Sequence, residues 1–283
     1  MALRDTPVRR PTTSVQVDTV DGGRALRRPD SLVTEEPMEI RLHGPGEEPT
    51  PVAVTMRTPG NDFELAVGFC VTEGLLTDPD DLASVAYCLG GEGEQLYNVV
   101  TIRRRTPAVA GIRDRAFVAN ASCGLCGKAT LDDVEQRVKP IEGAGPTVGA
   151  SLLVTLPSHL AEHQRVFDAT GGLHAAAGFG VDGALVASRE DVGRHNALDK
   201  LIGHAFLEHA LPLSQQVVLV SGRVSFELVQ KAAMAAIPVV CAVSAPSSLA
   251  VDAARRLGQT LVGFVRGDRA NVYTRPDRLD LES

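Results

Sequence analysis

The feature that most restricts the fold of this chain is an alternation of short apolar runs and amphipathic segments towards its C-terminal end. Apolar runs at residues 216–220, 239–243 and 261–265 indicate buried strands, and helical periodicity covers residues 224–236 and 248–257 between them. Apolar strands separated by helices are typical of βαβ units, in which helices cover both faces of a parallel sheet. The sequence therefore predicts an α/β layered domain in this region.

Further strands and helices are expected in the rest of the chain. We expect strands at residues 32–42, 52–57, 84–89, 95–103 and 272–274, a hairpin of residues 173–178 and 184–188, and helices over residues 61–73, 130–138, 158–167 and 191–210. Asn61 is expected to cap the first of these helices in a capping box with Glu64. Residues 1–30 have little apolar periodicity, which predicts a flexible tail with at most a short strand over residues 15–20.

The best candidate for a domain boundary is the stretch from residue 139 to residue 147, which contains two prolines and two glycines. We therefore expect a flexible tail over residues 1–30, a smaller α/β domain of α+β character over residues 31–145, and an α/β domain over residues 146–283. The smaller domain would end in a glycine-rich loop with two cysteines and the helix that follows this loop.

Three polar turns follow the predicted strands of the α/β domain, and they define a candidate binding site. The turns are Ser221-Gly222-Arg223, Ser244-Ala245-Pro246-Ser247-Ser248 and Arg266-Gly267-Asp268-Arg269. Ligands of open α/β sheets bind outside the carboxyl ends of the strands, and helix N-termini attract phosphate groups. We therefore expect a nucleotide or dinucleotide at this edge of the sheet. Asp191 and His195 could line the same pocket, although a structural role suits His195 equally well.

A second candidate site is the segment Ser122-Cys123-Gly124-Leu125-Cys126-Gly127-Lys128, which holds two of the five cysteines of the chain. The spacing brings both sulfur atoms to one side of a turn, and Lys128 can lower the pKa of a nearby thiol. Three interpretations fit: half of a zinc site, a dithiol–disulfide pair, and a persulfide carrier. Zinc normally needs four ligands, so His159 and His163 would have to complete the site. The chain contains no His-x-Glu motif of the zinc deaminases, which disfavours deamination.

Composition limits the class of protein. The net charge of −7 argues against general nucleic-acid binding, and 44% hydrophobic with 22% charged residues is ordinary for a soluble globular protein. The N-terminal residues lack the apolar core of a signal peptide, and no apolar run is long enough to span a bilayer. An odd number of cysteines without an export signal favours a reducing cytosol. We expect a cytoplasmic protein that has no membrane partner.

Several long sequence blocks, in one order, carry a resemblance to a known family. They are residues 58–69 (TPGNDFELAVGF), 122–128 (SCGLCGK), 171–176 (GGLHAA), 190–200 (EDVGRHNALDK), 221–227 (SGRVSFE) and 245–250 (APSSLA). With these blocks the sequence resembles the formate dehydrogenase accessory sulfurtransferase family, the FdhD proteins. The resemblance covers residues 34–274 and is poor in the N-terminal tail and near residues 44–49 and 104–115.

The resemblance implies a sulfur carrier that takes sulfane sulfur from a cysteine desulfurase. Such proteins pass this sulfur to the molybdenum cofactor, a bis-molybdopterin guanine dinucleotide, which then enters the formate dehydrogenase catalytic subunit. The persulfide cysteine of the family corresponds to Cys123, with Cys126 as its partner. The cofactor-binding stretch corresponds to Phe264-Val265-Arg266-Gly267-Asp268-Arg269. The resemblance also implies a cytidine-deaminase-like, three-layer C-terminal domain and a homodimer.

The sequence thus predicts a sulfurtransferase that binds the molybdenum cofactor as its substrate and holds no permanent metal. Cys123 and Cys126 are the expected catalytic residues. The expected cofactor-binding residues are Phe264, Val265, Arg266, Gly267, Asp268, Arg269, Ser221, Gly222, Arg223, Ser244 and Ser247. Two alternatives remain: a cofactor-binding chaperone without sulfur transfer, and a redox or zinc protein built on the cysteine pair.

Overall fold

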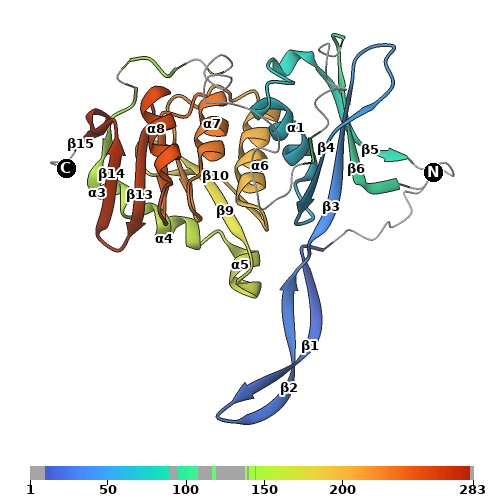
Figure 1. Ribbon diagram of the computed structural model, residues 1–283, viewed down its shortest axis with the longest axis vertical. Coiled ribbons are helices and arrows are strands. Elements are labelled where there is room, and N and C mark those ends of the chain that lie inside the picture. Colours follow the sequence, from blue (N-terminus) through green and yellow to red (C-terminus); the bar gives the residue numbers. More distant parts are fainter. Residues whose placement is uncertain are drawn as a thin grey trace.

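The computed structural model describes residues 10–89, 95–107, 117–118, 138, 140–143 and 145–280. Helices and sheets are arranged side by side in layers, and a long hairpin extends from one end (Figure 1). The fold is mixed α/β, as the sequence predicts. None of the helices in the described ranges is long and apolar enough to cross a lipid bilayer.

A six-stranded sheet with the order β10-β9-β11-β12-β13-β14 forms the centre of the C-terminal half. Its strands are β9 (His174–Phe179), β10 (Leu185–Asp191), β11 (Val217–Val220), β12 (Val239–Ala242), β13 (Thr260–Arg266) and β14 (Arg269–Thr274). Strands β11, β12 and β13 are parallel, whereas β9, β10 and β14 extend the sheet in antiparallel pairs. The strands predicted between residues 173 and 274 are confirmed, with ends that shift by a few residues.

Helices cover both faces of this sheet. Successive residues of a strand point to opposite sides, so apolar residues of one strand pack against helices on each face. Helices α6 (Arg194–Leu207), α7 (Phe226–Met234) and α8 (Ser248–Arg256) lie side by side on one face (Figure 1). Val218 and Val220 of β11 pack in the apolar cluster on that side. Val217 and Leu219 pack in a second cluster with α3 (Ala150–Leu153) and α4 (Leu156–Ala161) on the other. The predicted three layers are therefore present around β11.

One predicted helix, over residues 158–167, is wrong. The chain instead forms α4 and a separate short helix α5 (Arg165–Thr170). The carboxylate of Glu190, at the end of β10, accepts hydrogen bonds from the backbone N–H groups of Val166 and Phe167, at 3.1 and 2.9 Å. Because Glu190 satisfies the free N–H groups of a new helix start, a second helix begins there.

The first half contains a five-stranded sheet with the order β5-β6-β3-β4-β7. Its strands are β3 (Glu36–His43), β4 (Thr50–Arg57), β5 (Leu82–Leu89), β6 (Gln95–Arg104) and β7 (Phe117–Val118), and helix α1 (Asp62–Thr72) and the short turn η1 (Pro79–Asp81) connect β4 to β5. Near the C-terminal end, β8 (Val148–Gly149) pairs with β15 (Leu279–Asp280), which follows the turn η3 (Pro276–Arg278). The predicted helix over residues 130–138 lies almost wholly outside the described residues.

The predicted capping box at α1 is wrong. Asn61 adopts a left-handed conformation (φ 57°), and its side chain makes no capping hydrogen bond. Asp62 instead accepts hydrogen bonds from the N–H of Gly60 and from two nitrogen atoms of the buried Arg57. Glu64 pairs with Arg189 of β10. Glu64 of the expected box therefore contacts a distant strand, which the local pattern does not reveal.

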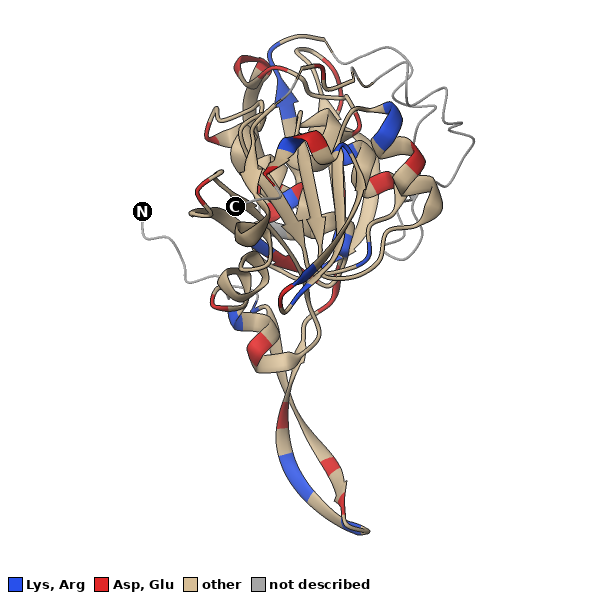
Figure 2. Cartoon of the chain, turned by 90° about the vertical axis from the view of Figure 1, so that its left-hand side faces the viewer, with Lys and Arg blue, Asp and Glu red and all other residues tan. Residues whose placement is uncertain are grey.

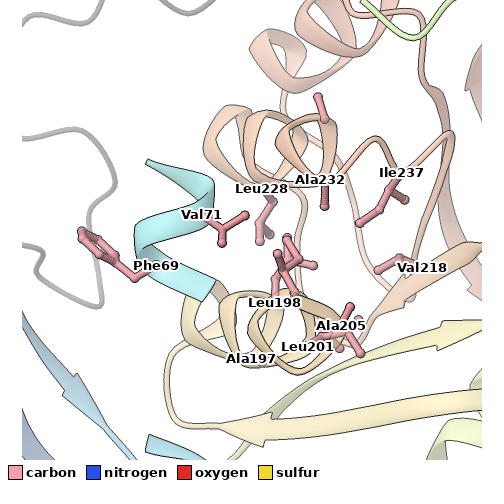
Figure 3. Packing of buried hydrophobic residues seen from close by; sticks show 14 of the residues in the cluster. Phe69, Val71, Ala197, Leu198, Leu201, Ala205, Val218, Leu228, Ala232 and Ile237 are labelled. Atoms are coloured by element: carbon pink, nitrogen blue, oxygen red, sulfur yellow. The ribbon is translucent and has the colours of Figure 1, made fainter. Parts of the chain in front are cut away.

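Helix α1 joins the two halves of the chain by packing against α6. A Cβ atom on Gly68 would lie 1.8 Å from the carbonyl oxygen of Asp199, and one on Gly203 would lie 1.8 Å from that of Glu64. The two helix backbones therefore touch where both residues are glycine. Around this crossing, Val71 of α1, Leu198 and Leu201 of α6 and Leu228 of α7 belong to one buried cluster (Figure 3).

The segment predicted as a flexible tail forms a hairpin of strands β1 (Thr12–Asp21) and β2 (Arg24–Val33). Gly22 and Gly23 both have positive φ, at 54° and 79°, which is the conformation of a type I′ hairpin turn. The hairpin projects away from the rest of the molecule (Figure 2). The Gly-Gly turn and the alternation of Val15 and Val17 with polar residues are the signals that the composition-based prediction overlooked.

Candidate functional site

The three polar turns predicted to form a site lie together at the carboxyl edge of the parallel strands. The N–H of Val224 donates to the carbonyl of Ala245 at 3.2 Å, and the N–H of Ser247 donates to the carbonyl of Val224 at 3.0 Å. The third turn joins them through a hydrogen bond from the Phe264 N–H to the Ser244 carbonyl, at 3.1 Å. The structure therefore brings together the turns that the sequence indicates, although their role in binding stays a prediction.

A hollow of about 230 Å³ lies at the β13–β14 end of this edge, and its described lining residues are Phe264, Arg266, Arg269 and Asn271. Phe264 has a φ of 55°, and the Arg266 guanidinium carbon lies 5.6 Å from the centre of its ring. Arg266 and Arg269 are directly opposite each other across the tight turn of the hairpin. Like charges in opposed positions destabilise a hairpin, whereas an anionic ligand would neutralise both.

The other predicted residues of this stretch differ in what they contact. The side chain of Val265 is fully buried in the apolar cluster beneath the sheet, so it supports the strand and faces away from the hollow. Gly267, with a φ of 60°, and Asp268 form the exposed turn between the two arginines. Asn271 was not predicted. It lies two residues after Arg269 on β14, a spacing that places both side chains on one face of a strand.

The serines of the two other turns form hydrogen bonds with backbone groups of the protein itself. The Ser221 hydroxyl accepts a hydrogen bond from the N–H of Ala175 at 2.8 Å. Ser247 caps α8, because its hydroxyl accepts from the N–H of Ala250 at 3.2 Å. Ser244 contributes its backbone carbonyl to the Phe264 N–H. Arg223 is exposed, and Gly222 next to it is buried. Arg223 is therefore the side chain of these turns that is best placed to bind an anion.

Asp191 and His195 lie near this edge, but only His195 is close to the polar turns. Asp191 is fully buried, forms an ion pair with Lys200 at 2.7 Å, and accepts a hydrogen bond from the N–H of Thr58 at 3.1 Å. Asp191 therefore fastens the start of α6 and does not line a pocket. The Nε2 atom of His195 lies 3.1 Å from the hydroxyl of Ser225, and burial lowers the pKa of His195 to about 3. His195 is consequently neutral at physiological pH.

The predicted catalytic cysteines, Cys123 and Cys126, lie outside the described residues, and their role stays a prediction. Of the remaining cysteines, Cys70 and Cys241 are fully buried, which raises the pKa of both thiols, that of Cys241 to about 12. A buried thiol with a raised pKa is a poor nucleophile. Cys88 is half-buried, with its sulfur atom 3.9 Å from a guanidinium nitrogen of Arg41.

The described geometry defines a class of protein: a layered α/β chain with an arginine-flanked hollow at the carboxyl edge of its sheet. The profile of the FdhD/NarQ family matches residues 33–280. The chain is 52% identical to the sulfur carrier protein FdhD of Streptomyces coelicolor over 284 aligned residues, which cover 97% of this chain and 98% of that protein. It is 50% identical to the protein of the same name from Mycobacterium tuberculosis, over 95% of this chain and 98% of that protein. The chain therefore belongs to the FdhD/NarQ family.

The fold also matches a solved structure. A crystal structure of a Desulfotalea psychrophila protein, provisionally described as a formate dehydrogenase accessory protein, superposes with a TM-score of 0.73. The match covers 95% of this chain and 99% of the other, at 22% sequence identity. At this level of identity the similarity supports the fold.

Proposed function

We propose that this chain is a cytoplasmic sulfur carrier that serves the maturation of formate dehydrogenase. It takes sulfane sulfur from a cysteine desulfurase as a persulfide on Cys123 and delivers it to the molybdenum cofactor, a bis-molybdopterin guanine dinucleotide. The single observation that carries this proposal is the match, at about half identity over almost the whole chain, to proteins named sulfur carriers. The homodimer implied by the family resemblance is part of the same proposal.

The proposed chemistry is thiolate exchange. The Cys123 thiolate attacks the outer sulfur of the persulfide on the desulfurase, a new S–S bond forms on Cys123, and the desulfurase thiolate leaves. The Cys126 thiolate then attacks the Sγ atom of Cys123, and the carried sulfur leaves as sulfide with the electron pair of the broken bond. The resulting Cys123–Cys126 disulfide is reduced by a cellular dithiol, which restores the carrier.

The hollow between β13 and β14 supports binding of a guanine nucleotide end of the cofactor. Arg266 and Arg269 provide two positive charges beside the Phe264 ring. An aromatic face suits stacking of a purine, and guanidinium groups bind phosphate through paired hydrogen bonds. The cofactor is the substrate that receives sulfur in this proposal.

Intact-mass spectrometry tests the sulfur-carrier function. The wild-type chain, Cys123→Ala and Cys126→Ala are incubated with a cysteine desulfurase and cysteine, and each is measured with and without a reductant. The expected result is a reducible gain of one sulfur atom, about 32 Da, in the wild type and none in Cys123→Ala, because the thiolate is the attacking group. Cys88→Ala is a matched control that should keep the gain.

A wild-type chain that gains no sulfur, with a desulfurase shown to be active, would reject the carrier function. The alternative would then be a chaperone that binds the cofactor without sulfur transfer. A Cys123→Ala chain that still supports formate dehydrogenase activity in cells would favour that same alternative.

A further inference from the structure

The basic side chains of the sheet edge extend well beyond the hollow. Besides Arg266 and Arg269, the edge carries Arg223 and Arg194, the latter at the first position of α6. Within the described part of the chain, none of these four arginines forms an ion pair with a carboxylate. These four arginines concentrate positive charge along one edge of a chain of net charge −7, which favours binding of an anionic ligand there.

Arg194 lies in a cluster with His174 and the turn at Gly222. A Cβ atom on Gly222 would lie 3.2 Å from the Nδ1 atom of His174 and 3.7 Å from the Cβ atom of Arg194. His174 begins β9, which is antiparallel to β11, so the amino end of β9 meets the carboxyl end of β11. The positive charges of Arg194 and Arg223 are both close enough to lower the pKa of His174, after the larger effect of burial.

Polar atoms in this cluster have unused hydrogen-bonding capacity. The Nε atom of Arg194 and the Oε2 atom of Glu227 are buried and have no hydrogen-bond partner among the described residues. Glu227 Oε2 lies 3.4 Å from His195 Nε2 without a hydrogen bond between them. A buried donor without an acceptor is destabilising, and an acceptor on a bound ligand would remove this cost for the Nε atom of Arg194.

Two helices begin at this cluster without a side-chain cap. Neither Gly193 at the start of α6 nor Ser225 at the start of α7 makes a capping hydrogen bond, and the Ser225 hydroxyl instead lies 3.1 Å from His195. The neighbouring helix α8 is capped by Ser247. The free N–H groups of α6 and α7 add to the positive potential of Arg194 and Arg223. Burial raises the pKa of Glu227, in the first turn of α7, which reduces the opposing negative charge.

We propose that Arg194, His174 and Arg223, with the N-termini of α6 and α7, form a second anion subsite that binds the diphosphate group of an extended nucleotide ligand. This subsite lies at β9 and β11, which are three and two strand spacings from β13 across the sheet. These spacings correspond to about 14 Å and about 10 Å between strand axes. A ligand that occupies both the hollow and the subsite is therefore extended, as a dinucleotide is. The inference rests on the proposed function for the identity of this ligand, but the subsite itself can be tested without it.

Calorimetric titration of the full-length chain with inorganic pyrophosphate tests the subsite. Wild type is expected to bind pyrophosphate, and Arg194→Gln is expected to bind it at least about tenfold more weakly, because a charge-assisted hydrogen bond is lost. Arg194→Lys keeps the charge but not the planar fork, and its affinity should fall between the two. Arg255→Gln is the matched control, since Arg255 is exposed on α8 and pairs only with Asp252 in the described structure.

Equal pyrophosphate affinity of wild type and Arg194→Gln would overturn the subsite, and so would an absence of binding to wild type. Far-ultraviolet circular dichroism confirms that the variant is folded. A failure of the proposed function is separate from these outcomes, because pyrophosphate binding needs neither Cys123 nor a desulfurase. A chain that gains no persulfide but loses pyrophosphate affinity on Arg194→Gln would keep the subsite and reject the sulfur carrier.

Discussion

Charged side chains near the sheet edge fall into two groups. Arg223, Arg266 and Arg269 are exposed and unpaired within the described structure, so their charges are available to a ligand. Lys200 of α6 and Lys231 of α7 are almost fully buried, each paired with an aspartate. Removing one partner of a buried pair leaves an uncompensated charge, so loss of either lysine would destabilise the scaffold of the site.

His195 should make the free energy of unfolding depend on pH, because burial lowers its pKa to about 3. The unfolded chain binds a proton at this histidine below about pH 6.5, whereas the folded chain stays neutral down to about pH 3. The contribution of His195 is therefore fully present above pH 6.5 and is lost as the pH falls towards 3. At pH 5 the loss in the free energy of unfolding is about 2 kcal/mol.

Urea unfolding of wild type and His195→Gln at pH 7 and pH 5 measures this loss. The difference between the two pH values should be smaller in His195→Gln by about 2 kcal/mol, while other titrating groups cancel. An equal pH dependence in both proteins would show that His195 is not held neutral in the folded state.

At the scale of elements, the sequence predicts structure well where the signal is local. The strands and helices between residues 173 and 274 follow from apolar periodicity, apart from the exact ends. The failures have tertiary causes: Arg189 pairs with Glu64, which was expected to complete the capping box of α1, and Glu190 starts α5. The hairpin β1–β2 was missed for a different reason, since its turn signal at Gly22-Gly23 was present in the sequence.

The crossing of α1 and α6 gives a prediction about two elements. In an isolated helix, replacing Gly68 by alanine would stabilise by about 1 kcal/mol. In the protein the added methyl group would lie 1.8 Å from the Asp199 carbonyl oxygen, so the helices must separate. We expect Gly68→Ala to lower the free energy of unfolding by about 1–3 kcal/mol or more, measured by urea denaturation.

Gly172→Ala is the control for this substitution. Its nearest contact would be 3.5 Å from Val33, and its φ is not in the left-handed region, so little change is expected. If Gly68→Ala were as stable as wild type, the helices would not be in backbone contact.

At the scale of the whole molecule, the sequence locates the binding edge but not its full extent. The turns after β11, β12 and β13 could be placed together because the carboxyl ends of parallel strands share one edge. His174 and Arg194 could not, because their position depends on the antiparallel pairing of β9 with β11 and β10. The cysteine pair is recognisable by its spacing alone, and its position relative to this edge lies outside the described residues.

The buried core also connects the two predicted domains. One apolar cluster contains Met38 and Ile40 of the first half together with Leu201 and Leu261 of the second. Polar contacts cross the same junction, since Lys231 of α7 lies 2.9 Å from the hydroxyl of Thr72 in α1 and pairs with Asp199 of α6 at 3.0 Å. Separating the halves would expose this cluster and leave buried charges without partners.

We therefore expect residues 31–145 and 146–283 to unfold together. Differential scanning calorimetry should show one transition, with a calorimetric enthalpy close to the van't Hoff enthalpy. Two separated transitions would instead mean that each half keeps a core of its own. Gly68→Ala distinguishes the cases further, because it weakens only the contact between α1 and α6. In a single cooperative unit this substitution lowers the one melting temperature, whereas independent halves would melt at temperatures that it leaves almost unchanged.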